Sequence, residues 1–303
     1  MISLQIEIFL LMAIGYVLAK KGYFSKETRS QLTNIILMVI LPCSIIHSFE
    51  IDLTKELITS TGFILIISFG IQLIYAFFNK FLYNHLDTDK KICCQYSTMV
   101  SNAGFMGMPI AEEVFGATGL LYASIFLIPQ RIFMWSSGLS LFAKNKQNNV
   151  LKQVLTHPCI IAIYIGIVVM ILRCFQIYIP QPIEKTLQAI SQCNTAMSML
   201  VIGGILSDVS LNDIFDKDAF IYSFYRLIML PLVICFILQF LPVNKISIQL
   251  CVLLSAMPAA STTAMLAQKY KGNALFASKL VFISTLLSLF TLPMCITLLN
   301  SIV

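Results

Sequence analysis

The sequence predicts an all-α polytopic membrane protein with ten transmembrane helices. Three observations support this. Hydrophobic residues make up 58% of the chain and charged residues only 11%, the mean hydropathy is +0.87, and long apolar runs recur along all 303 residues. Because a soluble domain carries about 25% charged residues, this composition could not cover the surface of a soluble globule. It excludes a soluble enzyme, a nucleic-acid-binding protein and a disordered chain. The net charge of +6 is explained by basic residues in short loops.

Ten apolar runs are long enough, at roughly 17–25 residues, to cross a bilayer. They cover residues 3–19, 31–49, 57–79, 92–111, 118–143, 154–174, 183–206, 219–241, 246–268 and 274–299. The connections between them are short, so we expect no soluble domain. We expect two halves of five helices each, residues 1–144 and 153–303.

The loop charges predict the orientation in the membrane. Counted with the adjoining ends of the runs, loops after odd-numbered runs hold thirteen Lys and Arg residues, whereas loops after even-numbered runs hold four. The positive-inside rule therefore places the odd-numbered loops in the cytoplasm and both termini outside, in the plasma membrane. The first run is not a signal peptide, because Lys20 and Lys21 follow it and no cleavage site is evident.

The two halves show signs of an internal repeat. An odd number of spans per half gives the halves opposite orientations. Residues 121–124 read Leu-Tyr-Ala-Ser at the start of the fifth run, and residues 275–278 read Leu-Phe-Ala-Ser at the start of the tenth. The matching position in each half favours two inverted five-helix repeats.

Just upstream of each match, an apolar run is interrupted by polar residues and proline. The interruptions are residues 101–109, with Pro109, and residues 255–263, with Pro258. Backbone groups freed inside a bilayer need partners in protein or in a watery cavity. Paired broken helices in inverted halves indicate a substrate site near the midplane of a secondary transporter. The alternative is that both prolines are ordinary kinks.

At these residues the chain resembles the auxin efflux carrier family, which includes the plant PIN auxin exporters and prokaryotic organic-acid carriers. The resemblance covers nearly the whole chain. Its motifs are Asn102 to Pro109, His157-Pro158, Met197 to Gly204, Arg226 with Leu230-Pro231, Met257-Pro258 and Ala277-Ser278. His157 is a departure, because the family usually has Asn-Pro at this point.

The resemblance implies ten helices in two inverted repeats, with broken, crossing helices 4 and 9. Helices 1, 2, 6 and 7 would form a scaffold that dimerises. Helices 3–5 and 8–10 would form a transport unit that moves past the scaffold in an elevator-like step, with the site at the crossing of helices 4 and 9.

Asn102 is the first candidate for substrate binding, since a neutral amide can donate to a carboxylate without the desolvation cost of a charge. The matching family position is implied to contact the substrate carboxylate; capping of its own half-helix is the alternative. Hydroxyls at the second break could bind the ligand or satisfy freed carbonyls. The predicted site comprises Asn102, Gly104, Pro109, Gln130, Arg131, Pro258, Ser261 and Thr262.

Charged residues inside the spans indicate the charge of the substrate. Gln130 matches a glutamine of the family, and Arg131 could attract an anion or form a structural pair. Away from the ends of the apolar runs, the three cations Arg131, Arg226 and Lys279 stand against Glu7 alone, which favours an anion. The role of Arg226 stays open between structure and function, and snorkelling also explains Lys279.

We therefore predict a secondary transporter for a small organic anion, such as a dicarboxylate or an aromatic acid, with no cofactor, metal or nucleic acid. Its other partners are the lipid bilayer and a second copy. Glu7 and His47 are candidate proton sites, while Glu112 and Glu113 are assigned to an outer loop. The alternatives are a sodium-coupled, bile-acid-type symporter and a membrane sensor or channel. A membrane enzyme is disfavoured because no catalytic motif is found.

Overall fold

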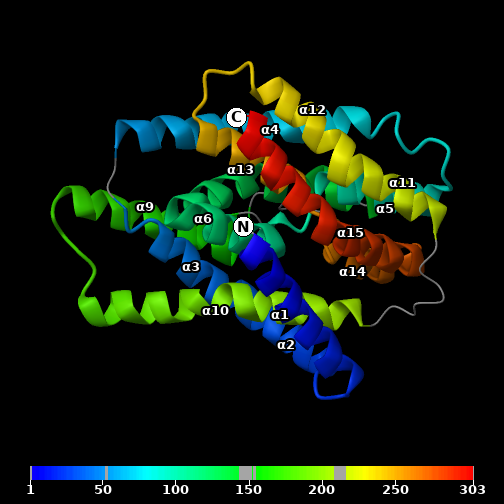
Figure 1. The fold of residues 1–303 in the computed structure, drawn as a ribbon, viewed down its shortest axis with the longest axis horizontal. Helices are drawn as coiled ribbons and strands as arrows, with labels where there is room; N and C mark the ends of the chain where they lie inside the picture. The colour runs from blue at the N-terminus through cyan, green and yellow to red at the C-terminus, as the bar shows by residue number, and fades with distance from the viewer. Residues whose placement is uncertain (1, 52–53, 143–151, 153–154, 208–215, 303) are drawn as a thin grey trace. The chain divides into compact units, whose positions relative to one another are not determined.

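The computed structural model describes residues 2–51, 54–142, 152, 155–207 and 216–302. Within these residues all regular secondary structure is helical, apart from one isolated β-bridge (Figure 1). The elements are α1 (Ile2–Lys20), α2 (Lys26–Ile35), η1 (Ile36–Ile40), α3 (Leu41–Ser48), α4 (Lys55–Phe78), α5 (Thr88–Met99), η2 (Ala103–Gly107), α6 (Met108–Phe133), η3 (Met134–Gly138), α7 (Leu139–Phe142), α9 (Pro158–Cys174), α10 (Gln181–Leu206), α11 (Lys217–Phe224), η5 (Tyr225–Met229), α12 (Leu230–Leu238), α13 (Lys245–Ser255), α14 (Thr262–Lys269) and α15 (Ala274–Ile302).

The helices have the length and composition of a multi-pass membrane protein. Six helical segments of the described chain are long and apolar enough to cross a bilayer: Lys26–Ser48, Lys55–Phe78, Ala103–Phe133, Gln181–Leu206, Lys217–Leu238 and Ala274–Leu299. Phe9–Lys20, Pro158–Cys174 and Lys245–Ser255 are shorter apolar helices. The total of ten spans and the inverted repeat stay predictions. The limits of the two predicted halves at residues 144 and 153 lie outside the described residues.

Three of the long helices contain a π-helical turn that ends two residues before a proline. The turns η1, η2 and η5 precede Pro42, Pro109 and Pro231, respectively. Proline has no N–H and clashes with the carbonyl four residues before it. A π turn widens the helix at that point, so the chain passes each proline without a break. Pro109 therefore lies within a helical segment, and the predicted interruption at 101–109 is confined to its first residues.

The fourth and fifth predicted runs are joined within α6 by a sharp bend. Gly116 has φ +68° and ψ −159°, a conformation that glycine adopts readily because it lacks a Cβ. The chain turns there without a loop. The assignment of Glu112 and Glu113 to an outer loop is therefore wrong, because both belong to the helical segment before the bend.

The chain forms two compact units. Unit 1 comprises residues 1–61, 105–125 and 155–208, and unit 2 comprises residues 62–104, 126–154 and 209–303. Each unit therefore contains segments from both halves of the sequence.

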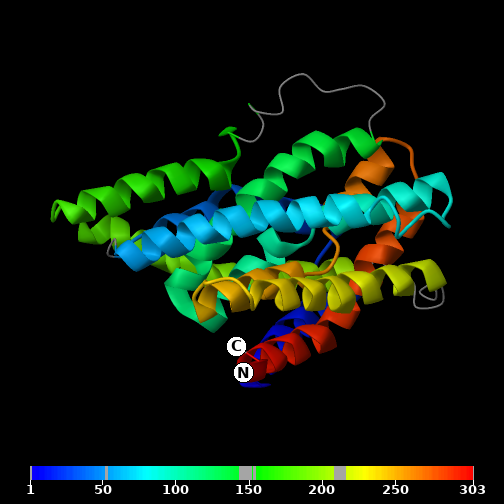
Figure 2. The same cartoon turned by 90° about the horizontal axis from the view of Figure 1, so that it is seen from above.

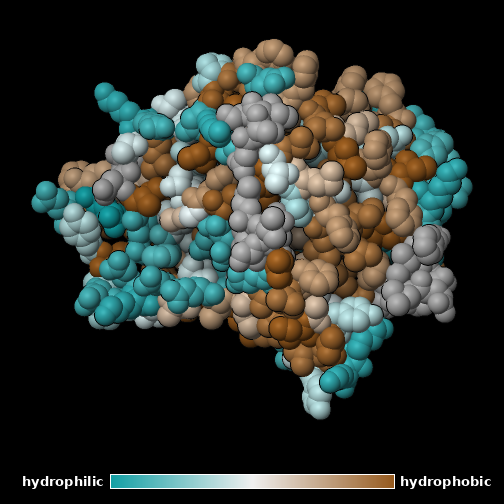
Figure 3. Space-filling model, viewed as in Figure 1, coloured by the Kyte–Doolittle hydropathy of each residue, from teal (hydrophilic) through white to brown (hydrophobic). Residues whose placement is uncertain are grey.

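In unit 1, α1 crosses α10, and α3 packs against α9 and α10 (Figure 1). Glycines allow the close approach of α1 and α10. A Cβ at Gly15 would overlap the backbone of Leu200, and a Cβ at Gly203 would overlap the backbone of Met12. Small residues play this role where helices pack inside a bilayer. The other side of α1 is apolar and exposed, as the brown surface over this helix shows (Figure 3).

In unit 2, α11, η5 and α12 form one continuous helix (Figure 2). Its α12 part packs against α13, and its α11 part packs against α15. The long α15 also packs against α5, α13 and α14. We call α11, η5, α12 and α15 the frame. The frame packs against α5 and α13, the two helices that end inside the unit.

Candidate functional site

Two helix breaks in unit 2 form the centre of the candidate site. The first break, residues 100–102, follows α5, and Val100 leaves the helical region with φ −120° and ψ 97°. The second break, residues 256–261, separates α13 from α14 and contains Pro258, which cannot donate a backbone hydrogen bond. Helix thus stops and resumes in both segments in which the sequence predicts an interruption.

The backbones of the two breaks bond to each other. Ser101 and Ala259 form an antiparallel β-bridge, and the N–H of Asn102 donates to the carbonyl of Pro258 at 2.8 Å. The N–H of Ala259 donates to Ser284 Oγ of α15 at 3.1 Å. Unpaired backbone groups are costly in a bilayer, so these bonds let two helices end inside the unit.

Side chains reinforce the contact between the breaks. The hydroxyls of Ser97 and Thr263 lie 2.8 Å apart, and Tyr96 donates to Thr262 Oγ1 at 3.2 Å. The hydroxyl of Thr262, which the sequence predicts to bind ligand, is therefore already bonded to α5. Ser261 has no side-chain bond to another described residue.

Gln130 of α6 fastens the first break by two bonds to the same residue. Its Nε2 donates to the carbonyl of Ser101 at 2.8 Å, and its Oε1 accepts from the Ser101 hydroxyl at 3.2 Å. Both residues are buried. The amide of Gln130 is thus used within the protein, which makes it a positioning group for the first break.

Arg226 connects both breaks through their carbonyls. It is 1% exposed, and it donates from Nε to Met257 O at 3.1 Å and from Nη1 to Thr98 O at 3.0 Å. Its guanidinium also lies over the ring of Tyr75, 4.7 Å from the centroid. The two carbonyls lie at, or just beyond, the C-terminal ends of α5 and α13, where the helix dipole is negative. A fixed positive charge therefore neutralises the two helix ends.

Besides Ser261, two predicted site residues have side-chain polar groups without a partner among the described residues. The side-chain amide of Asn102, 9% exposed overall, makes no hydrogen bond there; only its backbone N–H is bonded. Capping of its own half-helix by this side chain is therefore absent from the described structure. The guanidinium of Arg131, which follows Gln130 on α6, is 7% exposed and has neither a hydrogen bond nor an ion pair within the same residues.

The structure brings most, though not all, of the predicted residues into one unit. Those in unit 2 are Asn102, Gly104, Gln130, Arg131, Pro258, Ser261 and Thr262. Pro109 belongs to unit 1 and follows the turn η2 in the sequence. Gly104 lies in η2, and a Cβ there would meet only Leu127, at 3.8 Å, so this glycine is not required by packing.

Sequence reasoning missed the polar partners that join the breaks. Ser97 and Tyr96 lie in α5, before the predicted interruption, and give no signal of their own. Arg226 did give one, because a cation deep in an apolar run needs a partner. Its acceptors are backbone carbonyls, which no residue type marks, and so its role could not be read from the sequence.

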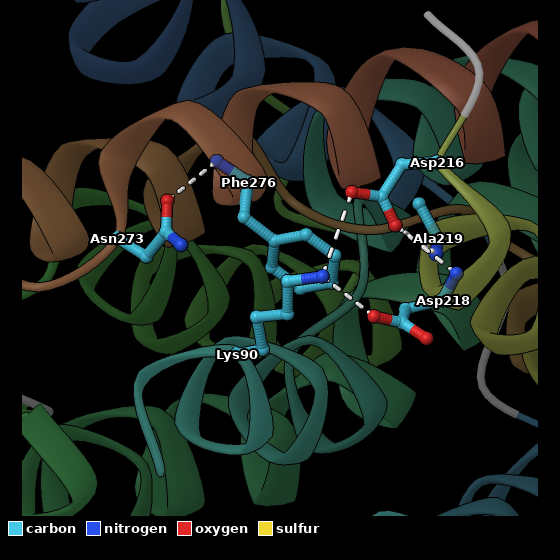
Figure 4. Close-up of polar contacts among 6 residues, drawn as sticks. All are labelled: Lys90, Asp216, Asp218, Ala219, Asn273 and Phe276. Atoms are coloured by element: carbon cyan, nitrogen blue, oxygen red, sulfur yellow. Dashed lines mark hydrogen bonds and ion pairs between the residues drawn. The ribbon is translucent and has the colours of Figure 1, made fainter. Parts of the chain in front are cut away.

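A polar cluster at the start of α5 holds the frame around the breaks. Lys90 Nζ lies 2.6 Å from Asp218 and 3.7 Å from Asp216, and it sits over the ring of Phe276 (Figure 4). Asp216 caps α11 by accepting from two backbone N–H groups, and Asn273 caps α15 by accepting from that of Phe276. The hydrogen bond to Asp218 raises the pKa of Lys90 above its ordinary value. The N-terminal ends of α5, α11 and α15 are thereby joined.

Comparison with known proteins identifies the family. Residues 1–296 match the family described as membrane transport protein. The chain is 25% identical over 301 residues to an uncharacterized transporter of Methanothermobacter thermautotrophicus, with 95% of each chain covered. It is 23% identical over 295 residues to one of Methanocaldococcus jannaschii, again with 95% of each covered. It is 21% identical over 277 residues to YfdV of Escherichia coli, covering 88% of this chain and 87% of that one.

These matches confirm the resemblance that the motifs of the sequence indicate, and they extend over nearly the whole chain. The protein therefore belongs to the membrane transport protein family of auxin efflux carriers, and it is a multi-pass membrane transporter.

Proposed function

We propose that the protein is a secondary carrier for a small organic anion, with its site at the two breaks of unit 2. The observation that carries this proposal is Arg131. Arg131 is 7% exposed, and its Nη1 is buried without an acceptor among the described residues. A positive charge held away from water in this way needs a negative partner. Among the described residues Arg131 has none. An anion that enters from outside the chain would supply the missing charge.

Neutral donors at the breaks support the same ligand. The amide of Asn102 is free to donate to a carboxylate. Helical segments begin directly after each break, at Ala103 and at Thr262. The N–H groups at such ends and the positive end of the helix dipole favour anions. A dicarboxylate or an aromatic acid is the substrate class we infer, since one carboxylate could meet Asn102 and the rest of the molecule Arg131.

A sodium ion at the breaks is less well supported. Sodium symporters bind the ion through carbonyls of unwound helix. Here the carbonyls of Thr98 and Met257 accept from Arg226, which already provides a positive charge. This favours the organic-anion carrier over the bile-acid-type symporter.

For the transport step we propose an elevator-like movement in which unit 2 carries the site and unit 1 is the scaffold. The bonds between the two breaks all fall inside unit 2, so the site would travel intact. We also propose that unit 1 forms a homodimer in the cell membrane, with both termini outside. The exposed apolar surfaces of α1 and α9 would then meet lipid or the second copy.

The test is counterflow in proteoliposomes. Vesicles preloaded with unlabelled malate are given labelled malate outside, with malonate and indole-3-acetate as competitors. A carrier gives saturable, transient accumulation of label, and the order of competition identifies the substrate class. A channel or a sensor gives none.

Two variants connect the flux to the site. Asn102→Ala and Arg131→Gln should each weaken substrate affinity at least about tenfold, because each removes a hydrogen-bond donor to the substrate. Met99→Leu, a conservative change in the neighbouring buried turn, should not. Wild-type affinity in a well-folded Arg131→Gln protein would reject the site.

A further inference from the structure

One face of α10 in unit 1 carries a row of polar side chains inside a membrane-length helix. Ser191, Asn194, Thr195 and Ser198 follow the spacing i, i+3, i+4 and i+7, which places them on one side of the helix. All four are buried. Polar residues of this kind inside a span are costly without a function.

This row meets the two carboxylates of the segment before the Gly116 bend. Glu112 accepts from Ser191 Oγ at 3.3 Å with one oxygen and from Asn194 Nδ2 at 3.4 Å with the other. Glu113 accepts from Thr195 Oγ1 at 3.4 Å. All of these donors are neutral, and all of the bonds are long.

No Lys or Arg side chain forms an ion pair with Glu112 in the part of the chain that the structure describes. The titratable groups whose charge acts on it are Glu113, next to it, and His47 of α3, which itself lies 3.4 Å from Glu50. The row on α10 contributes no ionisable group. An ionised Glu112 therefore has a like charge beside it in Glu113 and neutral hydrogen-bond donors around it, and His47, when protonated, favours the ionised form.

A hydrogen-bond acceptor for a protonated Glu112 is also present. Asn194 is 0% exposed, its Nδ2 points to Glu112, and its Oδ1 has no donor among the described residues. A buried carbonyl oxygen without a partner is uncommon and asks for an explanation.

We infer that Glu112 is a proton-binding residue of the transporter, and that Asn194 serves both of its protonation states. When Glu112 is ionised, Asn194 donates to it through Nδ2. When Glu112 takes up a proton from water, the new O–H can donate to Asn194 Oδ1 after the amide turns over, since the two ends of an amide have nearly the same shape. One O–H bond forms or breaks, and the charge of the cluster changes by one.

This inference rests on the protein being a transporter and not on the identity of its substrate. It gives the carrier an acid inside its helices that could couple transport to protons or make it depend on pH. Neither Glu7 nor His47, which the sequence analysis names as candidate proton sites, has this arrangement of a carboxyl group facing a buried amide.

The test is infrared difference spectroscopy of the purified protein during a pH titration, which needs no substrate. Wild-type protein should show a carboxylic-acid C=O band that appears as the pH falls. Glu112→Gln, which mimics the protonated side chain and keeps its hydrogen bonds, should lose this band. Glu56→Gln, at an exposed acid of α4, should keep it.

Further arms separate proton binding at Glu112 from a folding defect and from cation binding. Glu112→Asp retains a carboxyl group, so its band should persist with a changed midpoint, which also guards against a folding defect in the Gln variant. In counterflow, Glu112→Gln should lose pH dependence that Glu56→Gln retains. Persistence of the whole band in Glu112→Gln would overturn the inference, as would a band that sodium at constant pH removes.

Discussion

The helix breaks of unit 2 and the α1–α10 contact of unit 1 are held together in opposite ways. In unit 1 both helices are continuous, so their backbones are satisfied internally, and the contact depends on Gly15 and Gly203 allowing close approach. In unit 2 two helices stop inside the protein. Their ends need directional bonds, which come from the opposite break and from Arg226 and Gln130.

The difference shows what each region can do in a transporter. Packing through small residues needs only steric fit and leaves no polar group for a ligand. A break exposes backbone N–H groups and helix ends that can bind an anion. It must then satisfy the remaining groups within the protein. Substitutions should therefore act through lost polar bonds at the breaks of unit 2 and through steric overlap at the α1–α10 contact of unit 1.

The largest effect is expected for Arg226→Met. The change leaves the carbonyls of Thr98 and Met257 without donors, at about 1–3 kcal/mol for each buried acceptor. Arg226→Lys should be intermediate, because it keeps the charge but loses the forked geometry. The measurement is the melting temperature in detergent, followed with a thiol-reactive dye that reports the buried cysteines. A melting temperature for Arg226→Met equal to that of the wild type would show that the bonds from Arg226 to the two breaks are not needed for stability.

A smaller effect is expected for Gly203→Leu, which tests the contact in unit 1. Its side chain has no room beside the backbone of Met12, so the helices must separate; overpacking of this kind costs about 1–3 kcal/mol. The control is Gly62→Ala in α4, where a Cβ meets nothing within 4 Å. That variant should be as stable as the wild type or slightly more so, since alanine favours helix. Equal melting of Gly203→Leu and wild type would show that α1 and α10 do not depend on close approach.

The sequence predicts the class of fold and the segments in which two helices break. These features have local signals: apolar runs of membrane length, and proline with polar residues inside such a run. Local signals also mislead. Pro109 predicts a longer interruption than the structure has, because the turn η2 accommodates it. The sequence assigns Glu112 and Glu113 to a loop, whereas the chain needs only a single residue, Gly116, for the bend.

The partners across the breaks could not be predicted, for a physical reason. Arg226 bonds to Thr98, 128 positions away, through a backbone carbonyl. Ser97 and Thr263 are 166 positions apart, and hydroxyl residues are common. Pairings of this kind depend on how the helices pack, and one sequence carries no record of that. The lack of a partner for Arg131 Nη1 and for Asn194 Oδ1 also depends on helix packing, so only the structure reveals it.

The smallest effect is expected for Lys90→Met, at the edge of the frame that holds the breaks. Methionine has a side chain of similar length but removes the ammonium, which pairs with Asp218 and Asp216 and lies over the ring of Phe276. Both side chains are partly exposed, so the loss should be about 0.2–1 kcal/mol. Salt screens such a pair, and the difference in melting temperature between variant and wild type should therefore shrink in high salt. The effect of Arg226→Met should not, because its acceptors are fully buried carbonyls. An equal salt dependence of the two variants would mean that Arg226 acts as a solvent-screened charge. The distinction between the buried bonds of Arg226 and the partly exposed ion pair of Lys90 would then fail.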